Sequence, residues 1–282
     1  MKSQVQAVLI HHRLPVREPN RQQLRDLCEQ LKLPLIDIVD QPSLVADRIT
    51  VADGLWLVGR YCLKSAADGF FQWRSGRDSF PTALRRGLLE SCRSLHSLLT
   101  ATREARVSAY RTCLVERVLV HKHMAAWQVA LESDSDWLIV FEDDAQIQAE
   151  TKPRLQHFVA TELSHYCADR WIYCDLAGGY EIVRLLPSNA DWDPVLQCWC
   201  LPHIRTNTLC SYLISRQLMV DLLWVVQRFP LLRELPADHL INLASLQAQR
   251  KQEIPRCLHW RDPYFRHGSF QTGLTSTVSG VR

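Results

Sequence analysis

The chain has 282 residues and a mass of 32.6 kDa, which suits one large domain or two small ones. Hydrophobic residues make up 47% and charged residues 22%, so enough apolar surface is available to exclude a mainly disordered chain. The net charge of +3 does not indicate a nucleic-acid-binding protein, and no apolar run approaches the roughly 18 residues that a transmembrane helix needs.

The N-terminus and the cysteines favour a cytoplasmic protein. The apolar stretch 5–10 is too short for the core of a signal peptide. Ten cysteines are scattered along the chain with one close pair, Cys198 and Cys200, so reduced thiols are expected. Together with His203 and Cys210 this pair forms a loose Cys/His group, but its spacing matches no common zinc pattern and buried thiols are the favoured interpretation.

Hydrophobic periodicity predicts alternating strands and helices. In chain order we expect a strand at 5–11, a helix from Pro19 to Leu31, strands at 34–39 and 54–58, a loop at 60–80, helices at 84–99 and 110–129, a strand at 137–141, a helix near 152–166, strands at 171–175 and 208–214, a helix at 217–228, and then mostly loop with a helix near 238–249. The opening strand, helix and strand form a βαβ unit, which implies a parallel sheet. The order as a whole predicts an α/β fold with a Rossmann-like, mostly parallel mixed sheet flanked by helices.

Three adjacent carboxylates, Glu142, Asp143 and Asp144, follow the most apolar predicted strand. Five consecutive apolar residues, 137–141, are typical of a strand buried on both faces. Ligands of open α/β sheets bind outside the carboxyl ends of the strands, where this triplet is expected. On an extended chain Glu142 and Asp144 point to one side and Asp143 to the other, and oxygen ligands suit Mg²⁺ or Mn²⁺. The alternative is a solvated turn or a helix N-cap.

Several motifs in this order resemble glycosyltransferase family 25, which includes lipooligosaccharide and collagen galactosyltransferases. The matching segments are 121–127 (HKHMAAW), 137–145 (WLIVFEDDA), 171–176 (WIYCDL), 208–215 (TLCSYLIS), 236–238 (PAD) and 271–276 (QTGLTS). The segment that contains the triplet is specific to the family pattern. Each of the other segments is a weak match, and they support the resemblance mainly because they occur in the family's order. The chain departs from the family pattern after its first strand, at 11–15, and has Lys122 where the family has Ser.

The resemblance implies a GT-A fold and a metal-dependent transferase that uses a nucleotide-sugar, most simply a UDP-sugar. It makes Asp144 the firmest Mn²⁺ or Mg²⁺ ligand, with Glu142 and Asp143 on the metal or on the donor ribose. The family is of the inverting type, which requires a carboxylate base for the acceptor hydroxyl. Asp238 matches the family's Pro-x-Asp and is the candidate base; the alternative is an N-cap of the helix that begins there.

Three histidines and a tryptophan complete the candidate site. His123 and Trp127 lie four residues apart on one helix face, and the motif match places them at the donor site. A histidine on a buried helix is also commonly a core residue, and that alternative stays open. His259 and His267 are candidate late metal ligands, since GT-A enzymes often use a histidine near the end of the domain.

A basic segment spans residues 60–117, with eleven Lys or Arg against five acidic residues. One interpretation is a surface for donor phosphate, an acidic glycan or membrane headgroups, which allows peripheral association with the inner face of a membrane. The favoured alternative is a pair of solvated helix faces, because no cluster of these residues is contiguous.

The expected protein is therefore a single GT-A-like domain over 1–282, with nucleotide-sugar and metal in 1–150 and acceptor in 151–282. It would transfer a hexose such as galactose to a glycan or a lipid-linked saccharide, as in lipopolysaccharide biosynthesis. The alternatives are a metal-dependent phosphoesterase or nuclease that uses the same carboxylates, and a non-catalytic binding protein on a degenerate transferase scaffold.

Overall fold

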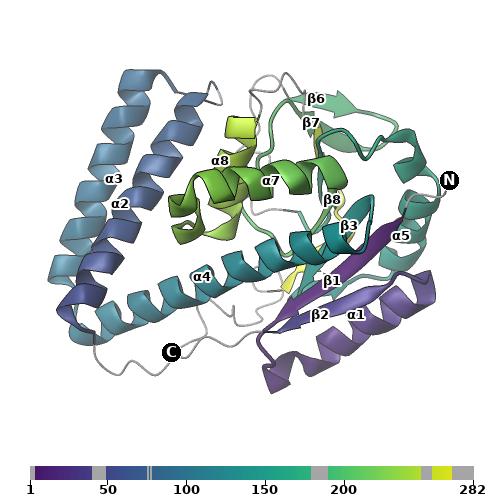
Figure 1. Cartoon of the computed structure of the whole chain (residues 1–282), viewed down its shortest axis with the longest axis horizontal. Helices are drawn as coiled ribbons and strands as arrows, with labels where there is room; N and C mark the ends of the chain where they lie inside the picture. Colours follow the sequence, from purple (N-terminus) through teal and green to yellow (C-terminus); the bar gives the residue numbers. More distant parts are fainter. Residues whose placement is uncertain are drawn as a thin grey trace.

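A computed structural model of the protein describes residues 4–39, 49–74, 76, 78–178, 190–248 and 256–268. The described chain has an α/β fold in which one large mixed sheet lies between two layers of helices (Figure 1). The Rossmann-like α/β class expected from the sequence is confirmed. Residues 271–276, which contributed to the family resemblance, lie outside the described residues.

The main sheet has eight strands in the order β2-β1-β3-β8-β5-β9-β7-β6. Its strands are β1 (Val5–His11), β2 (Leu35–Val39), β3 (Trp137–Glu142), β5 (Ile172–Asp175), β6 (Asp191–Asp193), β7 (Cys198–Leu201), β8 (Ser211–Ser215) and β9 (Arg256–Trp260). Strands β8 and β7 are antiparallel to the other six strands. Strand β8 pairs antiparallel with β3 and β5, and β7 pairs antiparallel with β9 and β6. The first four strands of the order contain strands from both halves of the sequence, so the two halves share one sheet.

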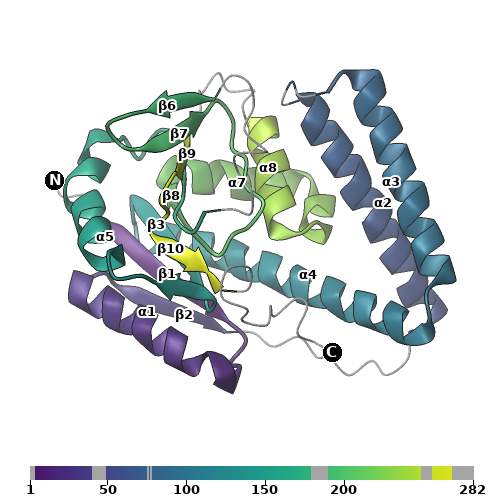
Figure 2. The ribbon, with the colours of Figure 1, turned by 180° about the vertical axis from the view of Figure 1, so that it is seen from behind.

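Helices cover both faces of the sheet. They are α1 (Glu18–Leu31), α2 (Val51–Arg74), α3 (Phe80–Thr100), α4 (Arg103–Glu132), α5 (Thr151–Ala160), α7 (Arg216–Arg228) and α8 (Ala237–Ala248), with 3-10 turns η1 (Pro15–Arg17), η2 (Glu162–His165) and η3 (Pro230–Glu234). Helices α4, α7 and α8 pack on one face, and α1 and α5 on the other (Figure 2). Within the described ranges, no helix is both long enough and apolar enough to cross a membrane.

Strand β3 is buried on both faces, as its uninterrupted apolar run predicts. Leu138 and Val140 contribute to the core under α4, α7 and α8, whereas Trp137, Ile139 and Phe141 contribute to the core under α1 and α5. Each such side chain contributes about 1.5–3 kcal/mol when fully buried, so the strand is firmly held from both sides. This burial fixes the point at which the acidic triplet leaves the sheet.

The predicted strand at 54–58 and loop at 60–80 are wrong, because Val51–Arg74 forms the single helix α2. The glycines that suggested a loop instead permit two helices to approach each other. A Cβ atom on Gly69 would lie 2.8 Å from the carbonyl oxygen of Ala83 in α3, and one on Gly87 would lie 3.2 Å from the carbonyl oxygen of Ser65. Residues 60–74 therefore belong to a packed helical hairpin, α2 with α3.

The C-terminal region contains two strands where mostly loop was expected. Strand β9 pairs with β5 and β7, and β10 (Phe265–His267) pairs with β4 (Ala145–Ile147) in a separate two-stranded ribbon. Strands of three to five residues carry little periodic signal, so their pairing partners decide their conformation. The helix predicted near 238–249 is confirmed as α8, and the one near 152–166 ends as α5 at Ala160 and continues as η2.

Candidate functional site

The candidate site lies where the carboxyl ends of β1, β3 and β5 meet the start of β8. The Glu142 amide donates to the carbonyl oxygen of Cys210 at 2.8 Å, and the Leu176 amide donates to that of Ser211 at 3.0 Å. These bonds place the triplet beside the residues that precede β8. The location at the strand ends agrees with the position expected for ligands in sheets of this class.

The three carboxylates diverge instead of sharing one side. The expectation that Glu142 and Asp144 point the same way required an extended chain, but β3 ends at Glu142 and the backbone turns at Asp143 and Asp144 before β4. Glu142 faces His123, Asp143 faces Arg21, and Asp144 faces His267. The three carboxylates of the triplet therefore have three different environments, although they lie within one turn.

Glu142 ends a chain of buried hydrogen bonds. Trp127 Nε1 donates to the Tyr212 hydroxyl at 3.0 Å, Tyr212 lies 3.0 Å from His123 Nδ1, and His123 Nε2 lies 3.2 Å from Glu142 Oε1. Burial raises the pKa of Tyr212, so its hydroxyl stays protonated. Because an indole N–H only donates, the tyrosine hydroxyl is left to donate to Nδ1, and Nε2–H then donates to Glu142.

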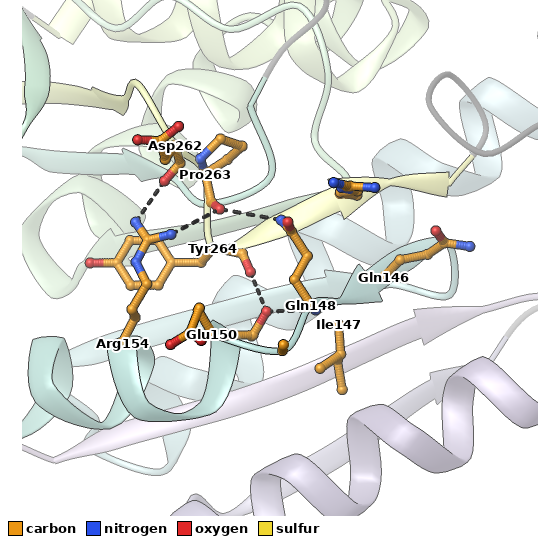
Figure 3. A pocket seen from close by; sticks show the side chains of 11 residues that line it. Gln146, Ile147, Gln148, Glu150, Arg154, Asp262, Pro263 and Tyr264 are labelled. Carbon is orange, nitrogen blue, oxygen red and sulfur yellow. Dashed lines mark hydrogen bonds between the residues drawn. The ribbon is translucent and has the colours of Figure 1, made fainter.

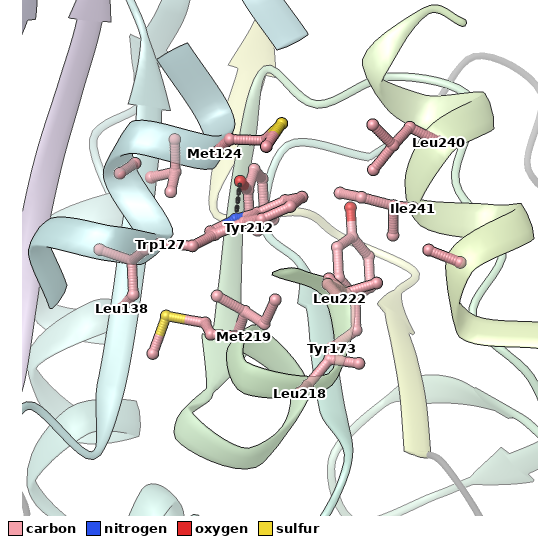
Figure 4. Packing of buried hydrophobic residues seen from close by; sticks show 14 of the residues in the cluster. Met124, Trp127, Leu138, Tyr173, Tyr212, Leu218, Met219, Leu222, Leu240 and Ile241 are labelled. Atoms are coloured by element: carbon pink, nitrogen blue, oxygen red, sulfur yellow. Dashed lines mark hydrogen bonds between the residues drawn. The ribbon is translucent and has the colours of Figure 1, made fainter. Parts of the chain in front are cut away.

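His123 and Trp127 therefore lie below the triplet, within the core under α4. Both side chains are 1% exposed, and Figure 4 shows Trp127 and Tyr212 joined among Met124, Leu138 and other apolar side chains. In this position His123 contacts the Glu142 carboxylate directly, and Trp127 holds His123 through Tyr212. Direct contact of either residue with a donor stays a prediction.

Asp143 lies in a basic environment formed by the start of α1. Arg21 Nη1 is 3.6 Å from Asp143 Oδ2, and the Arg17 charge also acts on this carboxylate. The pKa of Asp143 is raised to about 6, chiefly by burial; Asp144 and Glu142 also raise it, and Arg17 and Arg21 oppose them. Asn20 fixes the turn, since its Nδ2 donates to the carbonyl oxygens of Asp143 and Ala145 at 2.9 and 3.0 Å.

Asp144 lies with a histidine and a cysteine from distant parts of the chain. Asp144, Cys210 and His267 each offer one ligand atom, and these three atoms lie within 4.8 Å of one another. His267 Nδ1 is 3.5 Å from Asp144 Oδ2. The β4–β10 ribbon brings them together, because Ala145 pairs with His267 and the Gly268 amide donates to the Asp144 carbonyl at 2.8 Å. Of the five candidate ligands Glu142, Asp143, Asp144, His259 and His267, this group contains Asp144 and His267.

The donor set fits a divalent ion held by a carboxylate oxygen and an imidazole nitrogen, a combination that Mn²⁺ accepts. Burial raises the pKa of the Cys210 thiol well above its usual range, and the nearby carboxylates raise it further. A thiol binds a metal ion as the thiolate, so binding through Cys210 would release its proton. Asp144 and His267 are the oxygen and nitrogen donors of the group.

The other predicted residues lie elsewhere. His259 is buried on β9 with its Nδ1 3.3 Å from Asp175 Oδ2 and its Nε2 2.7 Å from the Arg205 carbonyl oxygen. Burial lowers the pKa of His259, but Cys257 and Asp175 outweigh it and raise the pKa to about 10. Asp238 lies in the first turn of α8 and lines a cavity of about 150 Å³ with Asp68 of α2; none of the three carboxylates of the triplet lines that cavity.

The loose Cys/His group of the sequence is dispersed in the structure. Cys198 belongs to the core under α1 and α5, His203 packs edge-on against Phe71 with ring centroids 5.9 Å apart, and Cys210 lies beside Asp144. The ten cysteines are free thiols.

Basic residues at the triplet were missed by sequence reasoning. Arg17 and Arg21 are buried beside Asp143, and Lys122 donates to the His11 carbonyl oxygen at 2.6 Å at the end of β1. The spacing of Arg17 and Arg21, one helical turn apart directly after the first strand, is a signal that could have found them. Lys122 occupies the position that the family resemblance gives to Ser, and its role could not be deduced from the motif.

A second cavity, of about 820 Å³, opens on the outer side of the β4–β10 ribbon (Figure 3). Arg154 of α5 reaches across it and donates to the carbonyl oxygens of Asp262 and Pro263, with its guanidinium 4.5 Å from the Tyr264 ring centre. Gln146 and Gln148 offer side-chain amides to the same space. The ribbon therefore carries the Asp144–His267 pair at one end and a polar cavity along its outer side.

No protein-family model matches the sequence, and a comparison with curated proteins gives no match.

Proposed function

We propose that the protein is a metal-dependent glycosyltransferase that moves a hexose from a nucleotide-sugar to a glycan or lipid-linked saccharide, with inversion. The observation that carries the proposal is the meeting of Asp144 and His267, 3.5 Å apart at the carboxyl end of the sheet although 123 residues separate them in sequence. The motif resemblance made Asp144 the firmest expected ligand, and His267 was one of two candidate late histidines, the other being His259.

Asp144 and His267 would hold a Mn²⁺ or Mg²⁺ ion. When bound, this ion supplies electrostatic stabilisation of the leaving diphosphate. Residues of the chain itself would bind the donor phosphates and position Glu142. Arg17 and Arg21 present guanidinium groups beside the triplet, and their planar donors match phosphate oxygens. The hydrogen-bonded His123 keeps Glu142 fixed, so that its carboxylate meets the donor with little loss of conformational freedom.

Asp238 stays the candidate base. The cavity that it lines also contains Asp68, His239 and Asn242, groups that hydrogen-bond to a hydroxyl. Catalysis by Asp238 requires the acceptor hydroxyl to reach this cavity. We expect Asp238→Asn to lower kcat strongly while nucleotide binding persists, because the change removes a proton acceptor and keeps the shape. The outcome that contradicts the role is an unchanged kcat.

The function is tested by a screen of UDP-, GDP- and CMP-sugars with Mn²⁺, in which donor hydrolysis and the melting temperature are measured. We expect Mn²⁺ and one nucleoside diphosphate together to raise the melting temperature, because a ligand that binds the folded state stabilises it. Asp144→Asn and His267→Gln should each abolish this shift. Asp134→Asn is the matched control, since that carboxylate is 89% exposed and lies at a surface pair with Arg216.

An unchanged shift in Asp144→Asn and His267→Gln would contradict the metal site. Hydrolysis of a generic phosphodiester without turnover of any nucleotide-sugar would favour the phosphoesterase alternative. Absence of nucleotide-sugar binding at millimolar Mn²⁺ would favour a non-catalytic protein on this scaffold.

A further inference from the structure

The helical hairpin of α2 and α3 projects from the side of the molecule away from the sheet (Figures 1 and 2). Helix α2 packs against α8, where Ala67 and Phe71 meet Leu243 and Leu246. Helix α3 packs on α2 through small residues, and its buried residues are Ala83 and Gly87. Most of the surface of α3 is therefore exposed.

One side of this hairpin is apolar along its whole length. We define the apolar hairpin face as Val51, Leu55, Phe70, Phe80, Leu84, Leu88, Leu95 and Leu99, whose side chains are between 38% and 82% exposed. On α3 the leucines recur at steps of four and seven residues, which places them on one stripe. At about 1.5 Å per residue the two helices extend this face over roughly 30 Å. Isolated exposed leucines are ordinary, but a continuous patch of this kind marks an interaction surface.

Two grooves between α2 and α3 open on this face. The first, of about 580 Å³, lies between Val51, Leu55 and Leu99 and has Arg103 and Arg106 among its lining residues. The second, of about 240 Å³, lies near the tip of the hairpin between Phe70, Phe80 and Leu84. Because stripe residues of both helices line both grooves, the grooves lie along the same side of the pair.

The charges of the hairpin are sorted between its sides. Its four acidic residues each have a partner, Asp53 in Tyr110 and Thr50, Asp68 in His239, Asp78 in Arg86 and Glu90 in Arg93. None of them lines either groove. By contrast, Arg103 and Arg106 border the first groove, and Arg74 lies over the ring of Trp73 beside the second. Arg103 and Arg106 belong to the first turn of α4, and Glu104, which lies between them in sequence, lines neither groove.

We propose that the apolar hairpin face binds an anionic lipid bilayer surface, with its leucines and phenylalanines entering the interface and Arg74, Arg103 and Arg106 contacting lipid phosphates. An apolar helix face bordered by arginine is the pattern of an interfacial helix, in which apolar burial and attraction to anionic headgroups add. A second copy of the chain fits less well, because two such faces would bring together grooves that are lined by arginines and by no carboxylate. This inference is independent of the proposed transferase activity, since the face shares no residue with the Asp144 group.

The test is flotation of the full chain with vesicles of phosphatidylcholine alone or mixed with phosphatidylglycerol. We expect binding to the mixed vesicles that weakens as salt rises, because salt screens the arginine–phosphate attraction. A variant with Leu84→Gln, Leu88→Gln and Leu99→Gln should lower the partition coefficient by roughly tenfold or more, since each leucine loses its transfer from water. A variant with Arg103→Gln and Arg106→Gln should lose most of the preference for phosphatidylglycerol.

The matched control is Leu89→Gln with Leu231→Gln, which removes two exposed leucines that line neither groove. The melting temperature of every variant is measured, because only folded variants are informative. The inference is overturned if the wild-type chain does not float with phosphatidylglycerol vesicles, or if the triple leucine variant floats as well as the control. It is also overturned if light scattering shows a dimer that the leucine changes dissociate while no vesicle binding occurs.

Discussion

Adjacent residues of this protein have different electrostatic surroundings. Glu142 accepts from His123, Asp143 lies beside buried arginines, and Asp144 meets His267, although the three are consecutive. Their separation reduces the repulsion that three carboxylates on one side of a strand would cause. The sequence predicts the triplet and its position, but the direction of each carboxylate follows from the turn and from the helices that border it.

A pH experiment tests the environment of a single buried histidine. Burial, and to a smaller extent the charge of Arg205, lowers the pKa of His203 to about 4. The unfolded chain binds this proton near pH 6.5, whereas the folded chain binds it only near pH 4. The stability that neutral His203 contributes is therefore fully present above pH 6.5 and is lost as the pH falls toward 4. Between pH 7 and pH 4, the free energy of unfolding should fall by about 2–3 kcal/mol less in His203→Phe than in the wild-type protein.

The measurement for His203 is the free energy of unfolding in urea at several pH values. His96→Phe is the control, because His96 is exposed on α3. Parallel pH curves for the wild-type protein and His203→Phe would show that this histidine does not titrate with a depressed pKa.

At the scale of elements, α2 shows why glycine misleads a local prediction. Glycine weakens a helix by about 1 kcal/mol relative to alanine, and Gly69 and Gly76, with Pro81 and mixed polar residues, favoured a loop at 60–80. The structure shows that Gly69 is required by the close approach of α3, whereas Gly54 and Gly59 have nothing within 4 Å of the position of a Cβ atom. Packing between helices, which the local sequence does not reveal, outweighs the propensity.

These glycines make a matched series of variants. Gly69→Ala should destabilise the protein by about 1–3 kcal/mol, because its methyl group would collide with backbone in α3. Gly54→Ala and Gly59→Ala should stabilise it by about 0.5–1 kcal/mol, since alanine is the better helix former and space is open. The check is the urea midpoint of each variant. Equal effects at Gly69 and Gly59 would contradict the close packing.

At the scale of the whole molecule, stability is concentrated in the sheet. Strand β3 is buried on both faces, whereas α3 rests on α2 alone and exposes most of its side chains. Local opening is easiest where few apolar side chains are buried. The hairpin is therefore expected to open without disturbing the Asp144 group.

Hydrogen exchange followed by mass spectrometry measures this difference. Amides of α3 should exchange at least about a hundredfold faster than those of β3, because opening α3 exposes little buried surface. The interior of α4 provides an internal comparison, since its middle residues belong to the main core and should exchange slowly. Similar protection of α3 and β3 would mean that the hairpin opens only with global unfolding.

The sequence by itself determined the α/β class, the helices α3 and α4, the buried strand β3 and the triplet at its end, because hydrophobic periodicity and chain order are local properties. Only the tertiary structure decided that residues 51–74 form one helix, that β9 and β10 exist as strands, and that His267 meets Asp144 while His259 pairs with Asp175. These features depend on contacts between residues far apart in sequence. A three-residue strand or a glycine-containing helix is stable only with its partner, and no local pattern specifies that partner.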